Sequence, residues 1–184
     1  MEIREETAGD EDAIGALHIA AFVGHGREVA CLVDDLRKES SEGTGLSLVA
    51  VDGASIVGHV FFSRGLLDAP RRLVEIQILS PLGVRPEHQR KGIGGALIAR
   101  GMELLGSRGV PLVFLEGDPR YYSRHGFVLA GERGFRKPSL RIPDAGFQVR
   151  FLPAYEQWMT GTVVYPQAFW KNDLVGLREA DPAA

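Results

Sequence analysis

The sequence is poor in the features that define several protein classes. Its only cysteine, Cys31, cannot form an internal disulfide, and no Cys/His cluster has the spacing of a zinc site, so no metal is expected. It has no apolar run of membrane-spanning length and no apolar signal core at its acidic N-terminus. Basic residues are in slight deficit, because 21 Lys and Arg stand against 24 Asp and Glu. The sequence therefore predicts a soluble, cytoplasmic protein that binds neither nucleic acid nor membranes in general.

The composition is otherwise that of an ordinary globular protein. Hydrophobic residues make up 45% and charged residues 24% of the 184 positions, which argues against disorder and against a fibrous protein. A chain of this length supports one substantial core. We find no internal repeat and no interdomain linker. We therefore expect a single domain over residues 1–184, with a core of about 1–166 and a C-terminal tail of 167–184.

The hydrophobic pattern predicts a mixed α/β fold. A helical hairpin precedes the sheet, and Asp52-Gly53 indicates a tight turn between two antiparallel strands. The long apolar run 73–84 predicts a strand covered on both faces, and the helix after Gly92 should cross over to a parallel strand. Helices are expected over 11–22, 28–37, 93–107 and 119–125, and strands over 2–5, 46–51, 55–63, 73–84, 110–115, from 127, over 147–152 and over 160–165.

The glycine-rich segment after the long strand is the strongest local signal. Residues 89–95, Gln-Arg-Lys-Gly-Ile-Gly-Gly, form a turn at the start of a helix, where backbone N–H groups lack intrahelical partners and favour an anion such as phosphate. The sequence lacks the dinucleotide-binding glycine pattern in its first strand-turn-helix unit and the Lys-Ser/Thr ending of a nucleotide-triphosphate loop. The alternative interpretation is that these glycines serve only tight packing or turn geometry and bind no anion.

Two motifs in a matching order of elements carry a family resemblance. Gln89, Gly92 and Gly94 match a Gln/Arg-x-x-Gly-x-Gly/Ala signature, and the downstream Tyr122 with Gly126-Phe127 matches Tyr-x-x-x-Gly-Phe. The chain resembles the GCN5-related N-acetyltransferase (GNAT) superfamily, in particular the small bacterial YhbS-type predicted N-acetyltransferases. The resemblance implies a mixed, mostly antiparallel central sheet of about six to seven strands with a splayed parallel pair, flanked by about four helices.

The resemblance also implies that acetyl-CoA is the co-substrate. Backbone N–H groups of the turn would hold its pyrophosphate, and the strand before the turn would pair with its pantetheine arm, with Gly83 marking a bulge that opens the sheet. Arg90 and Lys91 would add positive charge, the alternative being ordinary solvated cations. The predicted cofactor-binding residues are Leu82, Gly83, Val84, Gln89, Arg90, Lys91, Gly92, Ile93, Gly94, Gly95 and Tyr122.

Tyr122 is the predicted general acid, because a phenol with a pKa of about 10 is protonated at neutral pH and can donate to the departing thiolate. Packing of the short helix is its alternative role. The general base is not identified, since Ile78 stands where many relatives carry a glutamate. Candidates are Glu116, Glu75 as base or substrate contact, Gln77, Asp118 and His59, each of which also has an ordinary structural interpretation.

The predicted function is acetyl transfer from acetyl-CoA to a primary amine of a small molecule or an exposed protein group. The alternatives are a non-catalytic acyl-CoA-binding or sensor module of the same fold and a structural domain without cofactor. A homodimer is compatible with the sequence. Aromatic side chains from the first helices and the last strands are candidates for the acceptor pocket, with core packing or a dimer contact as alternatives: Phe22, Tyr155, Trp158, Tyr165, Phe169 and Trp170.

Overall fold

The protein is described by a computed structural model that covers residues 1–40 and 44–178, so part of the predicted turn at 40–45 and the end of the predicted tail lie outside the described residues. The described residues form one mixed sheet of nine strands, in the order β1-β2-β3-β4-β5-β8-β6, with β9 paired to β3 and β7. The strands are β1 (Glu2–Glu5), β2 (Leu46–Asp52), β3 (Ser55–Asp68), β4 (Leu73–Val84), β5 (Leu112–Glu116), β6 (Val128–Leu129), β7 (Phe135–Arg136), β8 (Phe147–Phe151) and β9 (Gly161–Val164).

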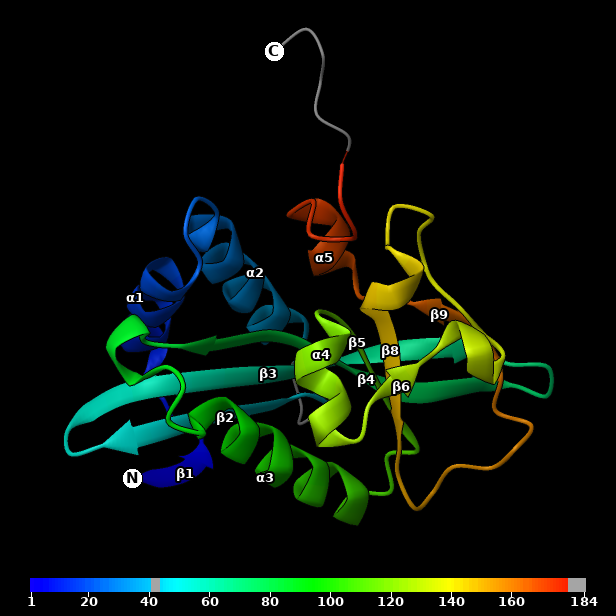
Figure 1. Ribbon diagram of the computed structural model, residues 1–184, viewed down its shortest axis with the longest axis horizontal. Coiled ribbons are helices and arrows are strands. Elements are labelled where there is room, and N and C mark those ends of the chain that lie inside the picture. The colour runs from blue at the N-terminus through cyan, green and yellow to red at the C-terminus, as the bar shows by residue number, and fades with distance from the viewer. Residues whose placement is uncertain (41–43, 179–184) are drawn as a thin grey trace, which may run out of the picture.

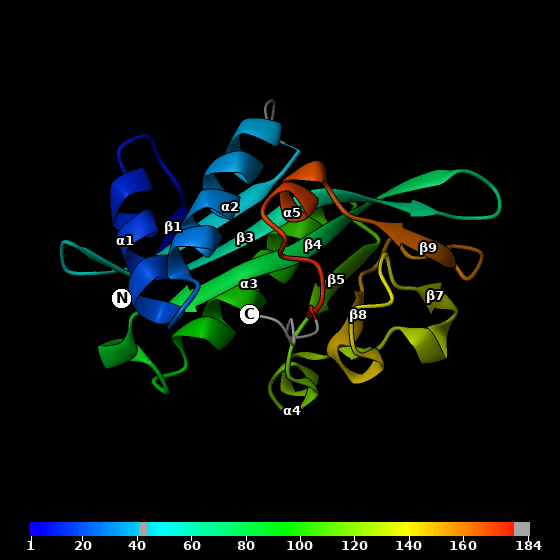
Figure 2. The ribbon, with the colours of Figure 1, turned by 90° about the horizontal axis from the view of Figure 1, so that it is seen from above.

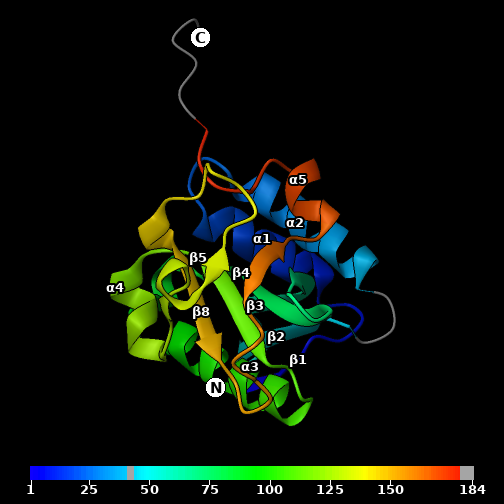
Figure 3. The same cartoon turned by 90° about the vertical axis from the view of Figure 1, so that its right-hand side faces the viewer.

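The helices cover both faces of this sheet. Helices α1, α2 and α5 lie on one face and α3 lies on the other, as Figure 1 and the side view of Figure 3 show. Seen from above, α2 and α5 lie next to each other over the middle of the sheet (Figure 2). The α-helices are α1 (Glu11–Ala21), α2 (Gly26–Glu39), α3 (Ile93–Ser107), α4 (Pro119–Tyr122) and α5 (Gln167–Lys171).

The sequence predicts this architecture well. The predicted strand 73–84 and the predicted end of the third helix at 107 are confirmed. The described sheet has nine strands, more than the expected six to seven. Strand β6 lies where a strand was expected from residue 127, whereas the two-residue strand β7 was not predicted. Strand β3 runs five residues beyond its predicted end at 63, since its last residues also pair with β9. The helix expected over 119–125 is one α-helical turn followed by a 3₁₀ turn.

Two apolar clusters form the core, one on each face of the sheet. Ile76 and Ile78 of β4 pack in the cluster under α1 and α2, while Leu79 packs in the cluster under α3. Because both faces of β4 are covered, the strand needs apolar side chains at nearly every position. That requirement explains why the run 73–84 lacks the alternating pattern of a half-exposed strand.

Strands β4 and β5 form the only parallel pair at the centre of the described sheet, and they separate after a short contact. They pair at Gln77↔Val113 and Ile78↔Phe114, after which β4 continues to Val84 and β5 ends at Glu116. Beyond Ile78, no described strand pairs with β4 on its β5 side. The predicted splayed pair is therefore present, and it leaves a free strand edge next to the turn before α3.

The irregularity in β4 lies before Gly83, which corrects the predicted bulge at that glycine. The β3–β4 register shifts between Phe62↔Leu79 and Val60↔Leu82, next to a cis Ser80–Pro81 peptide, whereas Gly83 pairs regularly with His59. A Cβ on Gly83 would lie 2.8 Å from His18 Nδ1 of α1. Glycine is needed here because α1 packs directly onto the strand.

Among the residues described, no helix has both the length and the apolar character needed to cross a membrane.

Candidate functional site

A groove of about 670 Å³ follows the turn between β4 and α3. Two residues of this turn have left-handed backbone conformations, Arg90 with φ +61° and Gly92 with φ +83°. The first intrahelical hydrogen bond of α3 runs from the Ala96 amide to the Gly92 carbonyl at 3.0 Å. The three preceding amides, at 93–95, therefore have no acceptor within the helix and remain available to an anion at its positive end.

Most of the predicted cofactor-binding residues lie in this groove. Two do not: Gly83 is buried under α1, and Lys91 is exposed beside the groove. Arg124 and His125, which follow the Tyr121-Tyr122 pair, were not predicted but add side chains to its wall. The lining consists of Leu82, Val84, His88, Gln89, Arg90, Gly92, Ile93, Gly94, Gly95, Tyr121, Tyr122, Arg124 and His125.

Two polar side chains hold the turn in position rather than pointing into open solvent. Gln89 Nε2 donates to the Val84 carbonyl at 3.1 Å, which ties the turn back to the end of β4. Arg85 Nε donates to the Ile56 carbonyl at 2.8 Å. Gln89 of the sequence motif therefore has a structural role, which is to hold the turn against the end of β4, and the sequence alone did not reveal it.

A second cavity, of about 310 Å³, lies between α1, α2 and α5 on one side and the splayed strands on the other. Of the six aromatic residues proposed for an acceptor pocket, Phe22, Tyr165 and Phe169 line it, whereas Tyr155 and Trp158 pack against the core elsewhere and Trp170 is 43% exposed. The lining consists of Phe22, His25, Val29, Leu32, Ile78, Leu79, Ser80, Pro81, Leu82, Glu116, Tyr122, Tyr165, Phe169 and Leu174.

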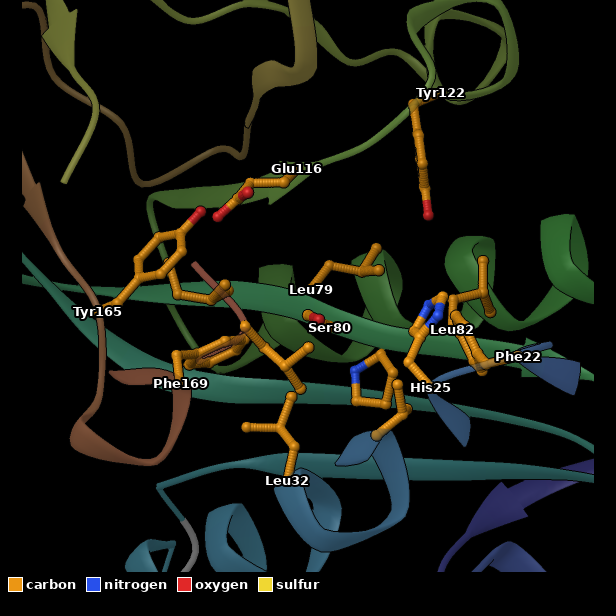
Figure 4. Close-up of a pocket in the computed structure, with 14 residues that line it drawn as sticks. Phe22, His25, Leu32, Leu79, Ser80, Leu82, Glu116, Tyr122, Tyr165 and Phe169 are labelled. Atoms are coloured by element: carbon orange, nitrogen blue, oxygen red, sulfur yellow. The ribbon is translucent and has the colours of Figure 1, made fainter. Parts of the chain in front are cut away.

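Tyr122 stands where the groove and the cavity meet. Together with Leu82 it lines both of them, and its hydroxyl points into the cavity from α4 (Figure 4). Its ring fills the space beside Gly117, where a Cβ would lie 2.3 Å from Tyr122 Cε2. Burial, and secondarily the neighbouring Tyr121, raise the pKa of Tyr122 above its usual value, so the phenol stays protonated.

Glu116 is the one predicted base candidate that reaches the cavity. It ends β5 level with Ser80, where the parallel strands separate. Its carboxylate accepts a 2.9 Å hydrogen bond from the Gly176 amide, and the Tyr165 hydroxyl points toward it (Figure 4). Burial raises the pKa of Glu116, an effect that the Gly176 hydrogen bond partly opposes.

The other candidates for the base lie away from the cavity. Glu75 is 66% exposed and forms an ion pair with Arg64. Gln77 Nε2 donates to the Thr44 carbonyl at 3.0 Å, and Asp118 caps α4 by accepting from the Arg120 amide at 2.9 Å. Because side chains alternate along β4, Gln77 and Ile78 face opposite sides of the sheet, and it is Ile78 that lines the cavity.

His59 belongs to a buried polar chain beneath the site. His18 Nε2 and His59 Nδ1 lie 2.7 Å apart, His59 Nε2 and Ser47 Oγ lie 2.9 Å apart, and Ser47 Oγ donates to Glu6. Because the Glu6 carboxylate only accepts, the chain has one consistent direction in which each imidazole Nε2 carries the hydrogen. His18 Nδ1 is left as a buried acceptor without a partner in the described residues, against Gly83.

Both imidazoles are neutral in the folded protein, which makes stability depend on pH. Burial lowers the pKa of His18 to about 4 and that of His59 further below its ordinary value. As the pH falls from about 6.5 to about 4, the unfolded chain binds protons that the folded chain does not, so the free energy of unfolding decreases by up to about 1.4 kcal/mol per pH unit for each histidine. Urea denaturation across this range measures the slope.

The control for this expectation is His18→Gln, because a glutamine amide can still donate to His59 Nδ1 but does not titrate. The slope between about pH 6.5 and pH 5 should fall by roughly half in this variant. An unchanged slope would show that the imidazole pair is not its source.

Comparison with known proteins identifies relatives over most of the chain. Residues 2–130 match the family model described as an acetyltransferase (GNAT) domain. The uncharacterized N-acetyltransferase YjhQ of Escherichia coli K12 is 37% identical over 162 residues, which span 84% of this chain and 86% of the relative. Both matches include β4, the turn and α3.

Two crystal structures share the fold across nearly the full length. The E. coli GNAT family N-acetyltransferase YhbS in complex with CoA aligns with a TM-score of 0.81 and 31% identity over 91% of both chains. A GNAT family acetyltransferase from Brucella melitensis in complex with acetyl-CoA aligns with a TM-score of 0.70 and 32% identity, over 91% of this chain and 97% of the other. With the splayed strands, the glycine turn and Tyr122 in their expected places, the chain belongs to the GNAT family of N-acetyltransferases.

Proposed function

We propose that the protein transfers the acetyl group of acetyl-CoA to a primary amine, with residues 1–184 acting as one domain. The observation that carries the proposal is the meeting of two spaces at Leu82 and Tyr122: a groove with a helix N-terminus suited to phosphate, and a cavity suited to a small acceptor. The complexes of the similar E. coli and Brucella proteins with CoA and acetyl-CoA support the same assignment.

The residues of the groove fit the chemical parts of acetyl-CoA. A Cβ on Gly94 would lie 2.6 Å from the Tyr121 hydroxyl and one on Gly95 2.8 Å from His125 Cε1, so the two glycines leave room for these side chains against the first turn of α3. Amides 93–95 would hold the pyrophosphate, with Arg90 and Arg124 as nearby cations. The free edge of β4 at 79–84 would pair with the pantetheine amides. Bound acetyl-CoA supplies an activated acetyl group as a thioester.

Glu116 and Tyr122 supply the proton transfers that the reaction needs, because two protons leave the acceptor nitrogen and one reaches the sulfur. Glu116 accepts a proton from the acceptor ammonium, which frees the nitrogen lone pair to attack the acetyl carbon. Tyr122 donates its hydroxyl proton to the sulfur as the carbon–sulfur bond breaks, and its phenolate is reprotonated by the second proton that the nitrogen loses on forming the amide. Because burial raises the pKa of Tyr122 above its ordinary value, the donor remains protonated at neutral and mildly alkaline pH. Burial also raises the pKa of Glu116, which makes its carboxylate a stronger base.

The direct test is thiol release from acetyl-CoA with purified protein and primary amines, compared between wild type and Glu116→Gln. We expect the substitution to lower kcat/KM about tenfold near pH 7 and to flatten the acidic limb of the pH profile. The difference should shrink at high pH, where the amine is already neutral and needs no base. Asp118→Asn is the control, because Asp118 is a carboxylate outside the cavity.

The possible outcomes test acetyl transfer and the role of Glu116 separately. Acetyl-CoA binding without thiol release for any primary amine would contradict catalysis and favour a non-catalytic acyl-CoA-binding module. Thiol release with the same pH profile in Glu116→Gln would retain the function and remove Glu116 as the base.

A further inference from the structure

The cavity that holds Glu116 has one charged end and an apolar body. Among its described lining residues, Glu116 is the only carboxylate, and none is lysine or arginine. The rest of the wall is largely aliphatic and aromatic, with Leu32 of α2, Phe169 of α5 and Leu174 behind α5 facing the space (Figure 4 labels the first two). Because His25 and Ser80 add polar atoms but no anion, the wall accommodates hydrocarbon and offers no carboxylate besides Glu116 to pair with a second ammonium group.

The C-terminal segment 172–178 closes the Glu116 end of the cavity. The Gly176 amide donates to Glu116 at 2.9 Å, and the Leu174 amide donates to the Phe169 carbonyl at 2.9 Å. A Cβ on Gly176 would lie 2.5 Å from the Arg141 carbonyl carbon, so this segment is packed tightly against a neighbouring loop. At about 310 Å³, the cavity is at the lower end of the range for small-molecule sites.

Glu116 still has acceptor capacity for a ligand. A carboxylate has about four lone-pair sites, and the described contacts assign only the hydrogen bond from Gly176. The Tyr165 hydroxyl points at the same carboxylate and is its second polar neighbour. A primary ammonium group placed here would be able to donate to both oxygens, since it carries three donors.

We infer that the acceptor is a small primary monoamine with an apolar body, bound with its nitrogen toward Glu116 and Tyr165 and its hydrocarbon part against Leu32, Phe169 and Leu174. This inference rests on the proposed acetyl transfer and names its substrate class. Diamines and polyamines are poor acceptors by the same argument, because a second ammonium group inside the cavity would have no carboxylate to pair with.

Hexylamine and cadaverine provide a matched test, because they have the same number of non-hydrogen atoms. Hexylamine ends in a methyl group where cadaverine carries a second ammonium group. With the full-length protein, kcat/KM for thiol release should be at least about 100-fold higher with hexylamine. A lysine-containing peptide serves as a third acceptor and should be similarly poor, since most of its chain stays outside the cavity.

Leu174→Glu tests whether this wall sets the preference. A carboxylate at this position would pair with a second ammonium, so the hexylamine-to-cadaverine ratio should fall at least about tenfold, while the Kd for acetyl-CoA stays unchanged. Leu177→Glu is the matched control, because Leu177 belongs to the same segment but is 71% exposed and does not line the cavity. Thermal unfolding of each variant establishes that it is folded.

Three results would overturn the inference. If the wild-type protein prefers cadaverine or the peptide, the acceptor is not an apolar monoamine. The thiol release in that experiment would still support acetyl transfer. Equal ratios in Leu174→Glu and Leu177→Glu show that the acceptor lies elsewhere. Binding of acetyl-CoA with no release for any of the three acceptors contradicts the proposed function, and the substrate class falls with it. The wild-type comparison stands even if Leu174→Glu does not fold.

Discussion

Replacing Tyr122 by phenylalanine is expected to lower kcat for acetyl transfer by about 10³-fold while leaving the Kd for CoA nearly unchanged. The substitution removes only the hydroxyl that points into the cavity. The ring keeps its contacts with Gly117 and Phe127, so the fold and the shape of the groove are preserved. Steady-state thiol release measures kcat, and titration calorimetry with CoA measures the Kd.

Tyr121→Phe is the control, because it removes the same atom from the adjacent residue. The Tyr121 hydroxyl lies in the groove beside Gly94 and outside the cavity, so its loss should affect CoA binding slightly and leave kcat close to wild type. Equal kcat values for wild type and Tyr122→Phe would show that Tyr122 only packs the short helix. A large rise in the Kd for CoA in Tyr122→Phe would assign its role to binding instead.

Replacing Gly94 by valine is expected to raise the Kd for CoA at least about 100-fold, equivalent to the loss of about two charge-assisted hydrogen bonds. The new side chain would fill the space over the first turn of α3, where even a Cβ would lie 2.6 Å from the Tyr121 hydroxyl. A phosphate would then be unable to approach amides 93–95. Calorimetric titration with CoA measures the effect directly.

Gly15→Val separates this effect from the general cost of valine in a helix. Gly15 lies in α1, and a Cβ there would meet nothing within 4 Å, so the variant should bind CoA as the wild type does. Thermal unfolding should show Gly94→Val to be no more stable than Gly15→Val, because both place one β-branched residue in a helix and only Gly94→Val must also displace the Tyr121 hydroxyl. Unchanged CoA affinity in Gly94→Val would mean that the pyrophosphate does not lie on this turn.

Local sequence signals predicted the donor side of the site. The apolar run 73–84, the glycines at 92 and 94 and Tyr122 act through neighbours within a few residues: a strand, a turn with φ +83° at Gly92, and a short helix capped by Asp118. Such local geometry follows from backbone and capping preferences that are visible in a single chain. The bulge predicted at Gly83 was wrong, because this glycine makes room for a helix that is distant in sequence.

The acceptor side depended on contacts between distant residues. Glu75 and Glu116 are both carboxylates in strands, yet one pairs with Arg64 at the surface and the other reaches the cavity because its strand ends where the parallel pair separates. The hydrogen bond between Gly176 and Glu116 spans 60 positions, and the one between His18 and His59 spans 41.

The sequence by itself thus determined the family, the glycine turn proposed to bind phosphate and the candidate acid, since each follows from local pattern. Only the tertiary structure decided which carboxylate faces the cavity and which side chains form its wall. The physical reason is that burial and charge environment are set by segments brought together on folding, here β4, β5, α2 and the segment after α5.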